Sequence, residues 1–193
     1  WSAGSPELLN NELLALHVSG GTTEFLHVIP SQNIITAERI GGTTDLAAGQ
    51  LIDRCGNLLG LSFPSGPALE TLALSSISKE YYLPRADGIN FSISGIENKI
   101  KDKLASGTSA EDIAAFTIRS VCELLCRALK AAVQIYPGIP ILCVGGVMSN
   151  SIIRREIETR FGAVFAKPEF SSDNAAGIAL LAALAHKGSG GYQ

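Results

Sequence analysis

The feature that most constrains this chain is an apolar run that ends in two glycines and leads into a helical pattern. Residues 139–144 have the composition of a buried parallel strand, and residues 151–158 that of a helix. Gly145 and Gly146 stand between them. Glycines let a ligand approach the backbone, and the free N–H groups and positive dipole of a helix start attract anions. The stretch predicts either an anion-binding turn or only a tight strand-to-helix connection.

The composition is that of a globular protein with a substantial core. The chain has 193 residues, of which 46% are hydrophobic and 17% charged. A net charge of −3 argues against binding nucleic acid by bulk electrostatics, although a local basic patch is compatible with it. The longest apolar segment, residues 175–185, is too short to span a bilayer. We expect a cytoplasmic protein without membrane contact.

The four cysteines show no spacing typical of a metal site. Cys122 and Cys126 share a face of a predicted helix, which suits either two small core residues or two ligands of a metal. Cys55 and Cys143 stand alone in apolar segments. We interpret all four as reduced cysteines, most simply as core residues.

The first part of the chain predicts an antiparallel meander of three strands. The strands cover Leu13–Val18, Thr23–Ile29 and Ile34–Ile40. The turns between them are Ser19-Gly20-Gly21-Thr22 and Pro30–Asn33.

A helix is predicted next, with Thr44 as its N-cap and Asp45 in its first turn. Its apolar stripe runs from Ala48 to Leu59, and its other face carries Gly49, Asp53, Gly56 and Gly60. A glycine inside a helix costs about 1 kcal/mol relative to alanine. Either another group comes close to this face and meets Asp53, or the glycines serve close helix–helix packing with Asp53 in solvent.

The remaining elements complete a recognisable order. A turn at 63–67 and a short helix at 68–74 precede an insertion, residues 75–108, with paired short strands at 81–84 and 90–94 and a polar helix to Lys103. Ser109 caps a long helix ended by Pro137-Gly138, and after the glycine turn come a strand at 163–166 and a last helix from Asp173 to about His186. We expect a linker at 1–11, one lobe at 12–187 and a tail at 188–193.

The predicted order of elements is βββ, α, insertion, α, β, α, β, α. This α/β order with a mixed sheet is that of the ribonuclease H-like lobe found in actin-like ATPases. In that superfamily, phosphates lie on the turn between the first two strands and on a later strand–glycine–helix junction. Here those positions are Ser19–Thr22 and Gly145-Gly146.

Six segments resemble one family within this superfamily, the TsaD (Gcp, or M22 "glycoprotease") family of tRNA adenosine threonylcarbamoyltransferases. They occur in the family's order across almost the whole chain. The segments are Val18–Glu24, Asp45–Asp53, Leu58–Pro67, Phe91–Gly95, Gly145–Asn150 and Pro168–Asn174.

The resemblance implies transfer of a threonylcarbamoyl group from threonylcarbamoyl-AMP to an adenosine of tRNA. It implies an adenine nucleotide (ATP or threonylcarbamoyl-AMP) lined by Val18, Ser19, Gly20, Gly21, Thr22, Asp53, Gly66 and Asn150, to which the superfamily position adds Gly145 and Gly146. It also implies a divalent metal, iron or zinc, with Asp173 as one ligand, although Asp173 also suits an N-cap. Asp53 has oxygens for ribose hydroxyls, and Asn150 offers both donor and acceptor.

The chain also departs from the family pattern. The family's two histidine ligands belong to an N-terminal half that this sequence does not contain, and His17, His27 and His186 lack the HxxxH spacing. Thr22, Glu24 and Ser65 replace the family's usual His or Asn, Gln and Gly. We therefore expect a divergent C-terminal lobe that begins within a longer protein and is inactive alone.

Three hypotheses of function follow. The chain is a lobe of a TsaD-like transferase, a non-catalytic paralogue that acts as a scaffold, or an actin-like small-molecule kinase, for which no motif marks a catalytic Asp. Expected partners are tRNA, the missing N-terminal lobe, and a TsaB-like protein or a second copy. For tRNA contacts we single out the insertion and two basic clusters, Lys99/Lys101/Lys103 and Arg154/Arg155, each of which also suits a solvated helix face.

Overall fold

A computed structural model describes residues 3–5, 8, 10–31, 35–167, 177–179, 181–183 and 186. The predicted meander is present as β1 (Leu13–Val18), β2 (Thr23–Pro30) and β3 (Ile35–Thr43), all antiparallel. β3 runs through Gly41 and Gly42, beyond the predicted strand end at Ile40. A Cβ on Gly41 would lie 2.6 Å from the Ile89 side chain, so the strand continues there only as glycine.

The sheet is mixed, as predicted. β6 (Ile141–Val144) lies parallel to β1, and β7 (Val164–Phe165) lies parallel to β6. On the other side β5 (Asn90–Phe91) pairs in parallel with β3, and β4 (Ala86–Asp87) pairs antiparallel with β5. The order across the sheet is β4-β5-β3-β2-β1-β6-β7.

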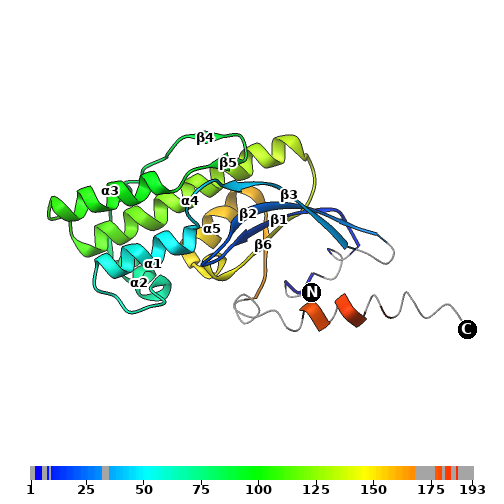
Figure 1. Cartoon of the computed structure of the whole chain (residues 1–193), viewed down its shortest axis with the longest axis horizontal. Helices are drawn as coiled ribbons and strands as arrows, with labels where there is room; N and C mark the ends of the chain where they lie inside the picture. The colour runs from blue at the N-terminus through cyan, green and yellow to red at the C-terminus, as the bar shows by residue number, and fades with distance from the viewer. Residues whose placement is uncertain are drawn as a thin grey trace, which may run out of the picture.

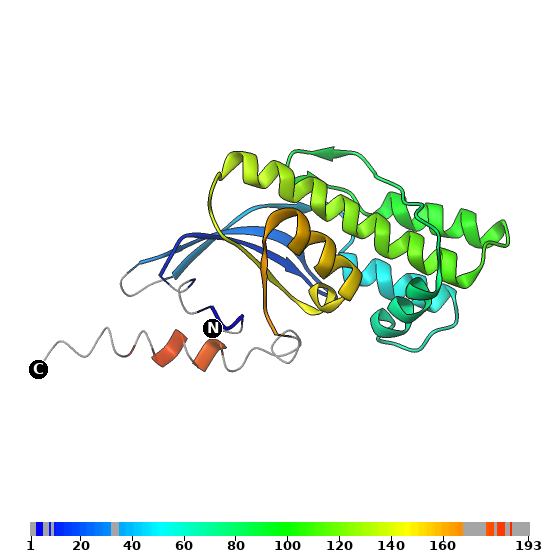
Figure 2. The ribbon, with the colours of Figure 1, turned by 180° about the vertical axis from the view of Figure 1, so that it is seen from behind.

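The long helix α4 (Ala110–Ile135) is the centre of the core. It lies with α5 (Ser151–Phe161) on one face of the sheet (Figures 1 and 2). Leu14, Leu16 and Val18 alternate along β1 toward this core and are almost fully buried. Ser109 caps α4 by accepting a hydrogen bond from the Asp112 N–H, as its sequence predicted. Leu13 and Ala15 point to the opposite face and form a small second cluster with Leu8.

Helix α1 (Ala48–Leu58) begins later than predicted, with Ala47 rather than Thr44 as its N-cap. Asp45 does not lie in its first turn. The Asp45 carboxylate instead accepts hydrogen bonds from the N–H groups of Leu46, Ile93 and Ser94 and from the Ser92 hydroxyl. Because the Asp45 carboxylate is occupied by these donors, it cannot cap α1. The helix therefore begins further along the chain, at Ala48.

The insertion forms different strands from those predicted. Residues 81–84 are not a strand, and the short strand that pairs with β5 is β4. After α2 (Gly66–Ser75), the chain passes along the surface of α4 (Figure 2). There the Tyr82 N–H donates to the Ser120 hydroxyl at 2.9 Å. Tyr82 therefore binds a side chain of α4 rather than a neighbouring strand.

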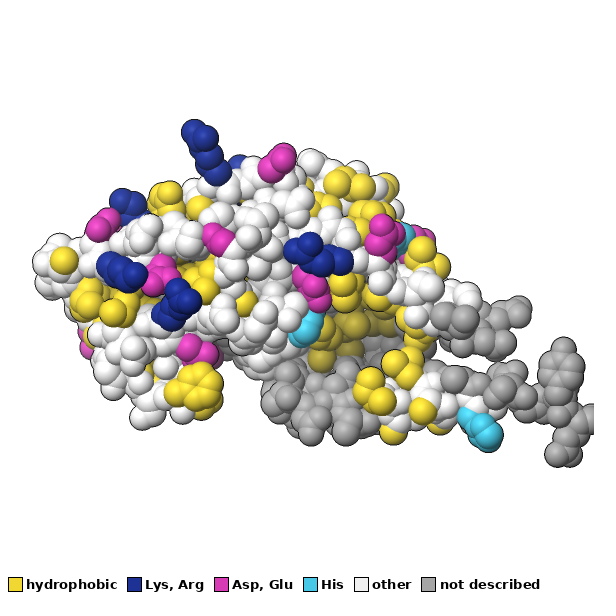
Figure 3. Space-filling model, in the orientation of Figure 1, with side chains coloured by type: hydrophobic (Ala, Val, Ile, Leu, Met, Phe, Trp, Pro, Cys, Tyr) yellow, Lys and Arg dark blue, Asp and Glu magenta, His cyan; other side chains and the backbone are white. Residues whose placement is uncertain are grey.

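Helix α3 (Ser94–Ala105) carries the predicted basic cluster, but its lysines are neutralised. Lys99 pairs with Asp102, Lys101 with Glu97 and Lys103 with Glu80. Over α1 and α3 the basic and acidic side chains adjoin one another (Figure 3). This cluster is a solvated, ion-paired helix face.

The four cysteines are buried core residues. Burial raises the pKa of the Cys55 thiol to about 11 and that of Cys143 to about 12, so both are neutral at pH 7. Within the described ranges, no group of three His, Cys, Asp or Glu side chains has the arrangement of a metal site. Nor does any helix there have the length and apolar character needed to cross a membrane.

Candidate functional site: a pocket between two glycine turns

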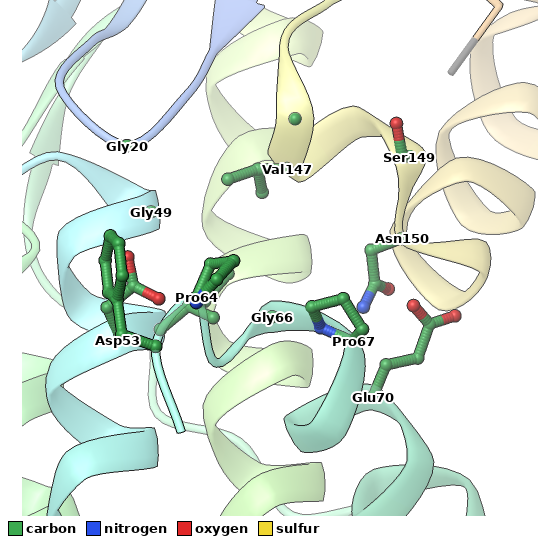
Figure 4. Close-up of a pocket in the computed structure, with 13 residues that line it drawn as sticks. Gly20, Gly49, Asp53, Pro64, Gly66, Pro67, Glu70, Val147, Ser149 and Asn150 are labelled. Carbon is green, nitrogen blue, oxygen red and sulfur yellow. The ribbon is translucent and has the colours of Figure 1, made fainter. Parts of the chain in front are cut away.

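A pocket of about 550 Å³ lies where the carboxyl ends of β1 and β6 meet α1 and α2 (Figure 4). It brings together Gly20, Asp53, Gly66, Gly146 and Asn150, five residues of the predicted site. The other lining residues were not predicted as ligand contacts. These are Gly49, Ile52, Phe63, Pro64, Pro67, Glu70, Val147 and Ser149.

The Gly145-Gly146 turn requires glycine at its first position. Gly145 has φ of 102°, and a Cβ there would lie 2.3 Å from the carbonyl oxygen of Val18. Gly146 opens instead onto free space and begins the short 3-10 helix η2 (Gly146–Ser149), an element that the sequence did not predict. Gly145 thus packs closely against the end of β1, while Gly146 presents backbone without a side chain to the pocket.

The Ser19–Thr22 turn between β1 and β2 also bonds to itself on one side and faces the pocket on the other. The Ser19 N–H donates to the Thr22 carbonyl, and the Thr22 N–H donates to the Ser19 hydroxyl. Gly20 faces the pocket, where a Cβ would meet no atom within 4 Å. Val18, Ser19, Gly21 and Thr22 build this turn without being part of the pocket lining.

The glycine-bearing face of α1 lies against the chain's own turns. A Cβ on Gly49 would lie 2.5 Å from the Ser19 carbonyl oxygen, and one on Gly56 would lie 2.1 Å from the Ser65 Cβ. Ser65 is buried, and its N–H donates to Asp53 Oδ1 at 2.9 Å. Asp53 therefore fixes the Phe63–Pro67 turn with one oxygen, while its side chain still lines the pocket.

Asn150 has a divided role. Its Oδ1 accepts hydrogen bonds from the N–H groups of Ile152 and Ile153, each at 3.1 Å, so it is the N-cap of α5. Its amide nitrogen points toward the pocket side of Pro67 and Glu70 (Figure 4). The sequence expectation of both donor and acceptor is corrected: the acceptor is used within the protein, and a donor remains for a ligand.

Glu70 completes the start of α5 from the opposite wall. It accepts hydrogen bonds from the N–H and hydroxyl of Ser151. The first three N–H groups of α5 are therefore satisfied, and the prediction of free helix N–H groups facing a ligand is wrong for α5. Asp53 and Glu70 are the charged residues of the described pocket lining, which includes no Lys or Arg.

The remaining residues singled out in the sequence are Asp173 with its segment, and the side chains His17 and Glu24. Asp173 and the segment 168–174 lie outside the described residues. His17 and Glu24 face each other at 3.6 Å, and Glu24 also pairs with Arg39 at 3.5 Å. These three side chains belong to β1, β2 and β3 and do not line the pocket.

A family model described as "TsaD: tRNA N6-adenosine threonylcarbamoyltransferase" matches residues 3–180. The chain belongs to the TsaD family. A relative of that name from Kosmotoga olearia is 36% identical over 185 residues, and one from Nitrosomonas eutropha is 34% identical over 184. The alignments cover 90% and 89% of this chain but 55% and 54% of the relatives. The chain thus spans about half the length of the curated TsaD proteins that it matches.

Solved structures confirm the actin-like fold predicted for this TsaD chain. One match is component A of the Acidaminococcus fermentans (R)-2-hydroxyglutaryl-CoA dehydratase, with a TM-score of 0.57 and 20% identity. The match covers 95% of this chain and 64% of component A. A second match is the activator of the Clostridium difficile 2-hydroxyisocaproyl-CoA dehydratase with bound ADPNP, with a TM-score of 0.57 and 16% identity. The match covers 97% of this chain and 66% of the activator. At these identities the likeness concerns the fold alone.

Proposed function

We propose that this chain is the nucleotide-binding lobe of a transferase that moves a threonylcarbamoyl group from threonylcarbamoyl-AMP to adenosine in tRNA. The observation that carries the proposal is that family residues far apart in the sequence meet at one place. Residues from four of the six family segments, represented by Gly20, Asp53, Gly66 and Asn150, meet around one pocket. They come from distant parts of the chain, and a common ligand accounts for their meeting.

The adenosine half of the donor suits this pocket better than a phosphate does. Two carboxylates without a lining cation disfavour an anion and favour a group with hydroxyl donors, such as ribose. The second oxygen of Asp53 would accept from a ribose hydroxyl, and the amide of Asn150 would donate to an acceptor nitrogen of the base. Phe63, Pro64 and Pro67 supply apolar surface for the ring.

The acyl phosphate would lie against the glycine turns at Gly20 and Gly146, where no side chain intervenes. In the transfer, the adenine amino nitrogen of tRNA attacks the carbamoyl carbon and releases one proton to water. The bond from that carbon to the phosphate oxygen breaks, and AMP leaves with the electron pair. Backbone N–H groups beside the turns would stabilise the leaving phosphate. The pocket-lining carboxylates hold the nucleotide in this scheme, and we assign neither as general base.

The expected iron or zinc has no ligand set among the described residues, so we derive no step from it. Asp173 remains a proposed ligand. We further propose that the N-terminal half found in relatives supplies the opposite wall of the cleft, that this chain alone is inactive, and that a TsaB-like protein or a second copy is a partner. The whole would act in the cytoplasm on tRNA.

A non-catalytic paralogue is the alternative, suggested by Thr22, Glu24 and Ser65. None of the three lines the pocket: Thr22 closes its own turn, Glu24 pairs with Arg39, and Ser65 fills the space beside Gly56. Departures from the family at positions away from the ligand do not require loss of activity. This favours the transferase.

The test is formation of threonylcarbamoyladenosine by the intact protein from threonylcarbamoyl-AMP and unmodified tRNA, detected by mass spectrometry of digested tRNA. We expect product with the native protein. An Asp53→Asn variant, which keeps an acceptor for Ser65, should give at least about tenfold less at limiting donor, because a hydrogen bond to a charged group contributes about 1.5–3 kcal/mol. Binding of donor and tRNA without any product would instead support the paralogue.

A further inference from the structure

A second, smaller hollow lies beside α5. It has a volume of about 190 Å³ and is formed by the segment after α2 together with α4 and α5. Figure 2 shows that segment crossing α4 on the side where α5 lies. We call this hollow the α4–α5 groove; its polar lining consists of Lys79, Tyr81, Arg119, Glu123, Glu156 and Arg160, with Cys122 and Ile152 at its base.

Both acids of the groove are already engaged. Glu123 binds Arg160 through both carboxylate oxygens, at 2.9 and 2.6 Å, and Glu156 contacts the same guanidinium at 3.0 Å. The Glu123 hydrogen bond raises the pKa of Arg160 further above its usual value, so this cluster keeps its charges. Lys79 and Arg119 take part in none of the ion pairs found among the described residues.

The groove therefore presents two cations that have no acidic partner in the described part of the protein, beside the half-exposed ring of Tyr81. This distinguishes it from α3, whose three lysines are all ion-paired. It also distinguishes it from Arg154, whose guanidinium stacks on the Phe165 ring at 4.9 Å. Unpaired Arg and Lys next to an aromatic ring form a combination that binds phosphate and stacks on an unpaired base.

The groove is close to the nucleotide pocket. Asn150 lines the pocket and Ile152, two residues further on, lines the groove. Glu156 lies six residues, about 1.7 helical turns, beyond Asn150, a rise of about 9 Å at 1.5 Å per residue. An RNA strand that presents an adenosine at the pocket would therefore have nearby phosphates within reach of the groove.

We propose that the α4–α5 groove binds the RNA strand next to the modified adenosine, with Arg119 and Lys79 contacting phosphates and Tyr81 stacking on a neighbouring base. This inference rests on the proposed function, since it takes tRNA as the substrate. Phosphate contacts position an RNA without reading its sequence, and single-stranded bases stack on aromatic rings. A protein with net charge −3 can bind RNA in this way because the contact depends on a local pair of cations.

The test measures the affinity of the intact protein for unmodified tRNA at several salt concentrations. For a Lys79→Ala/Arg119→Ala variant we expect at least about tenfold weaker binding and a salt slope smaller by about 1.5, since each phosphate contact contributes about 0.7–0.9. Arg119→Lys, which keeps the charge and loses the planar fork, should bind with intermediate affinity. The matched control is Lys99→Ala/Lys101→Ala, which also removes two positive charges but from ion-paired positions, and it should change affinity less than twofold.

Nucleotide affinity is measured for every variant, and it should stay at the native value because neither Lys79 nor Arg119 lines the nucleotide pocket. Native-like tRNA affinity and salt slope in both groove variants would overturn the inference while leaving the proposed function intact. Loss of a protein partner with unchanged tRNA affinity would also overturn it, and would mark the groove as a protein contact. If the native protein fails to bind tRNA at all, the proposed function fails together with it.

Discussion

The Glu70 carboxylate accepts a hydrogen bond of 2.8 Å from the backbone N–H of Ser151 and so joins α2 to the start of α5 across the pocket. Two walls of the pocket that are 81 residues apart in sequence are held by this contact. The negative charge of Glu70 also lies near the positive end of the α5 dipole, and this interaction stabilises the helix. The shape of the pocket therefore depends on a side chain that also lines it.

We predict that Glu70→Ala lowers the free energy of unfolding by about 1–2 kcal/mol, because it removes a charged helix cap. Glu70→Gln should lose less, since its amide oxygen still accepts from Ser151. Urea denaturation measures both. Glu158→Gln, on the exposed face of the capped helix α5, is the control and should change stability by no more than about 0.5 kcal/mol. Equal stability of Glu70→Ala and this control would show that the cap is unimportant.

The contact between Gly56 and Ser65 makes a second prediction. Gly56→Ala should destabilise the protein by about 1–3 kcal/mol, because the new methyl group would overlap the Ser65 side chain, which is buried. Ser65→Gly restores the family's usual residue and removes the obstacle, so the double variant should recover most of the loss. Thermal unfolding of the four proteins in a double-mutant cycle gives the coupling. Additive effects would contradict the proposed steric contact.

Asp45 makes a prediction about pH. Burial opposes its ionisation, but hydrogen bonds from Ile93, Ser92, Ser94 and Leu46 outweigh burial and hold its pKa well below the usual value. A lowered pKa in the folded state contributes stability above the unfolded-state pKa of about 4, and this contribution is lost as pH falls below that value. Asp45→Asn should therefore be less stable than the native protein at pH 7, by about 1 kcal/mol for a solvent-accessible carboxylate, and the difference should shrink below pH 4.

Urea midpoints of the native protein and Asp45→Asn between pH 7 and pH 3 measure this effect. A difference that stays constant over that range would mean that the charge of Asp45 is not what stabilises the 92–94 segment.

The fold was predictable because its local signals agree with its tertiary structure. The strand at β1, the long helix α4 and its Ser109 cap were each predicted from local sequence. The errors came where a distant contact replaced a local one. Asp45 is a reasonable helix-start residue by local rules, but its carboxylate binds Ile93, 48 residues away.

The site was predictable where chemistry depends on residue type. Gly145 is required by its backbone conformation, and Asn150 by its cap. Glu70 was missed because its role depends on Ser151 in another helix, although its position one helical turn after Gly66 offered a weak signal. The groove at Arg119 could not be found from sequence, since no motif distinguishes a paired cation from an unpaired one.

The most direct test of the central claim is calorimetric titration of ATP into the native protein and into Asn150→Ser. Serine can still cap α5, so the helix should remain intact, but it lacks the amide donor that faces the pocket. We predict that the native protein binds ATP and that Asn150→Ser binds at least about fivefold more weakly, for a hydrogen bond worth about 1 kcal/mol or more, at nearly unchanged thermal stability. No binding by the native protein, or equal binding by both, would contradict a nucleotide site at this pocket.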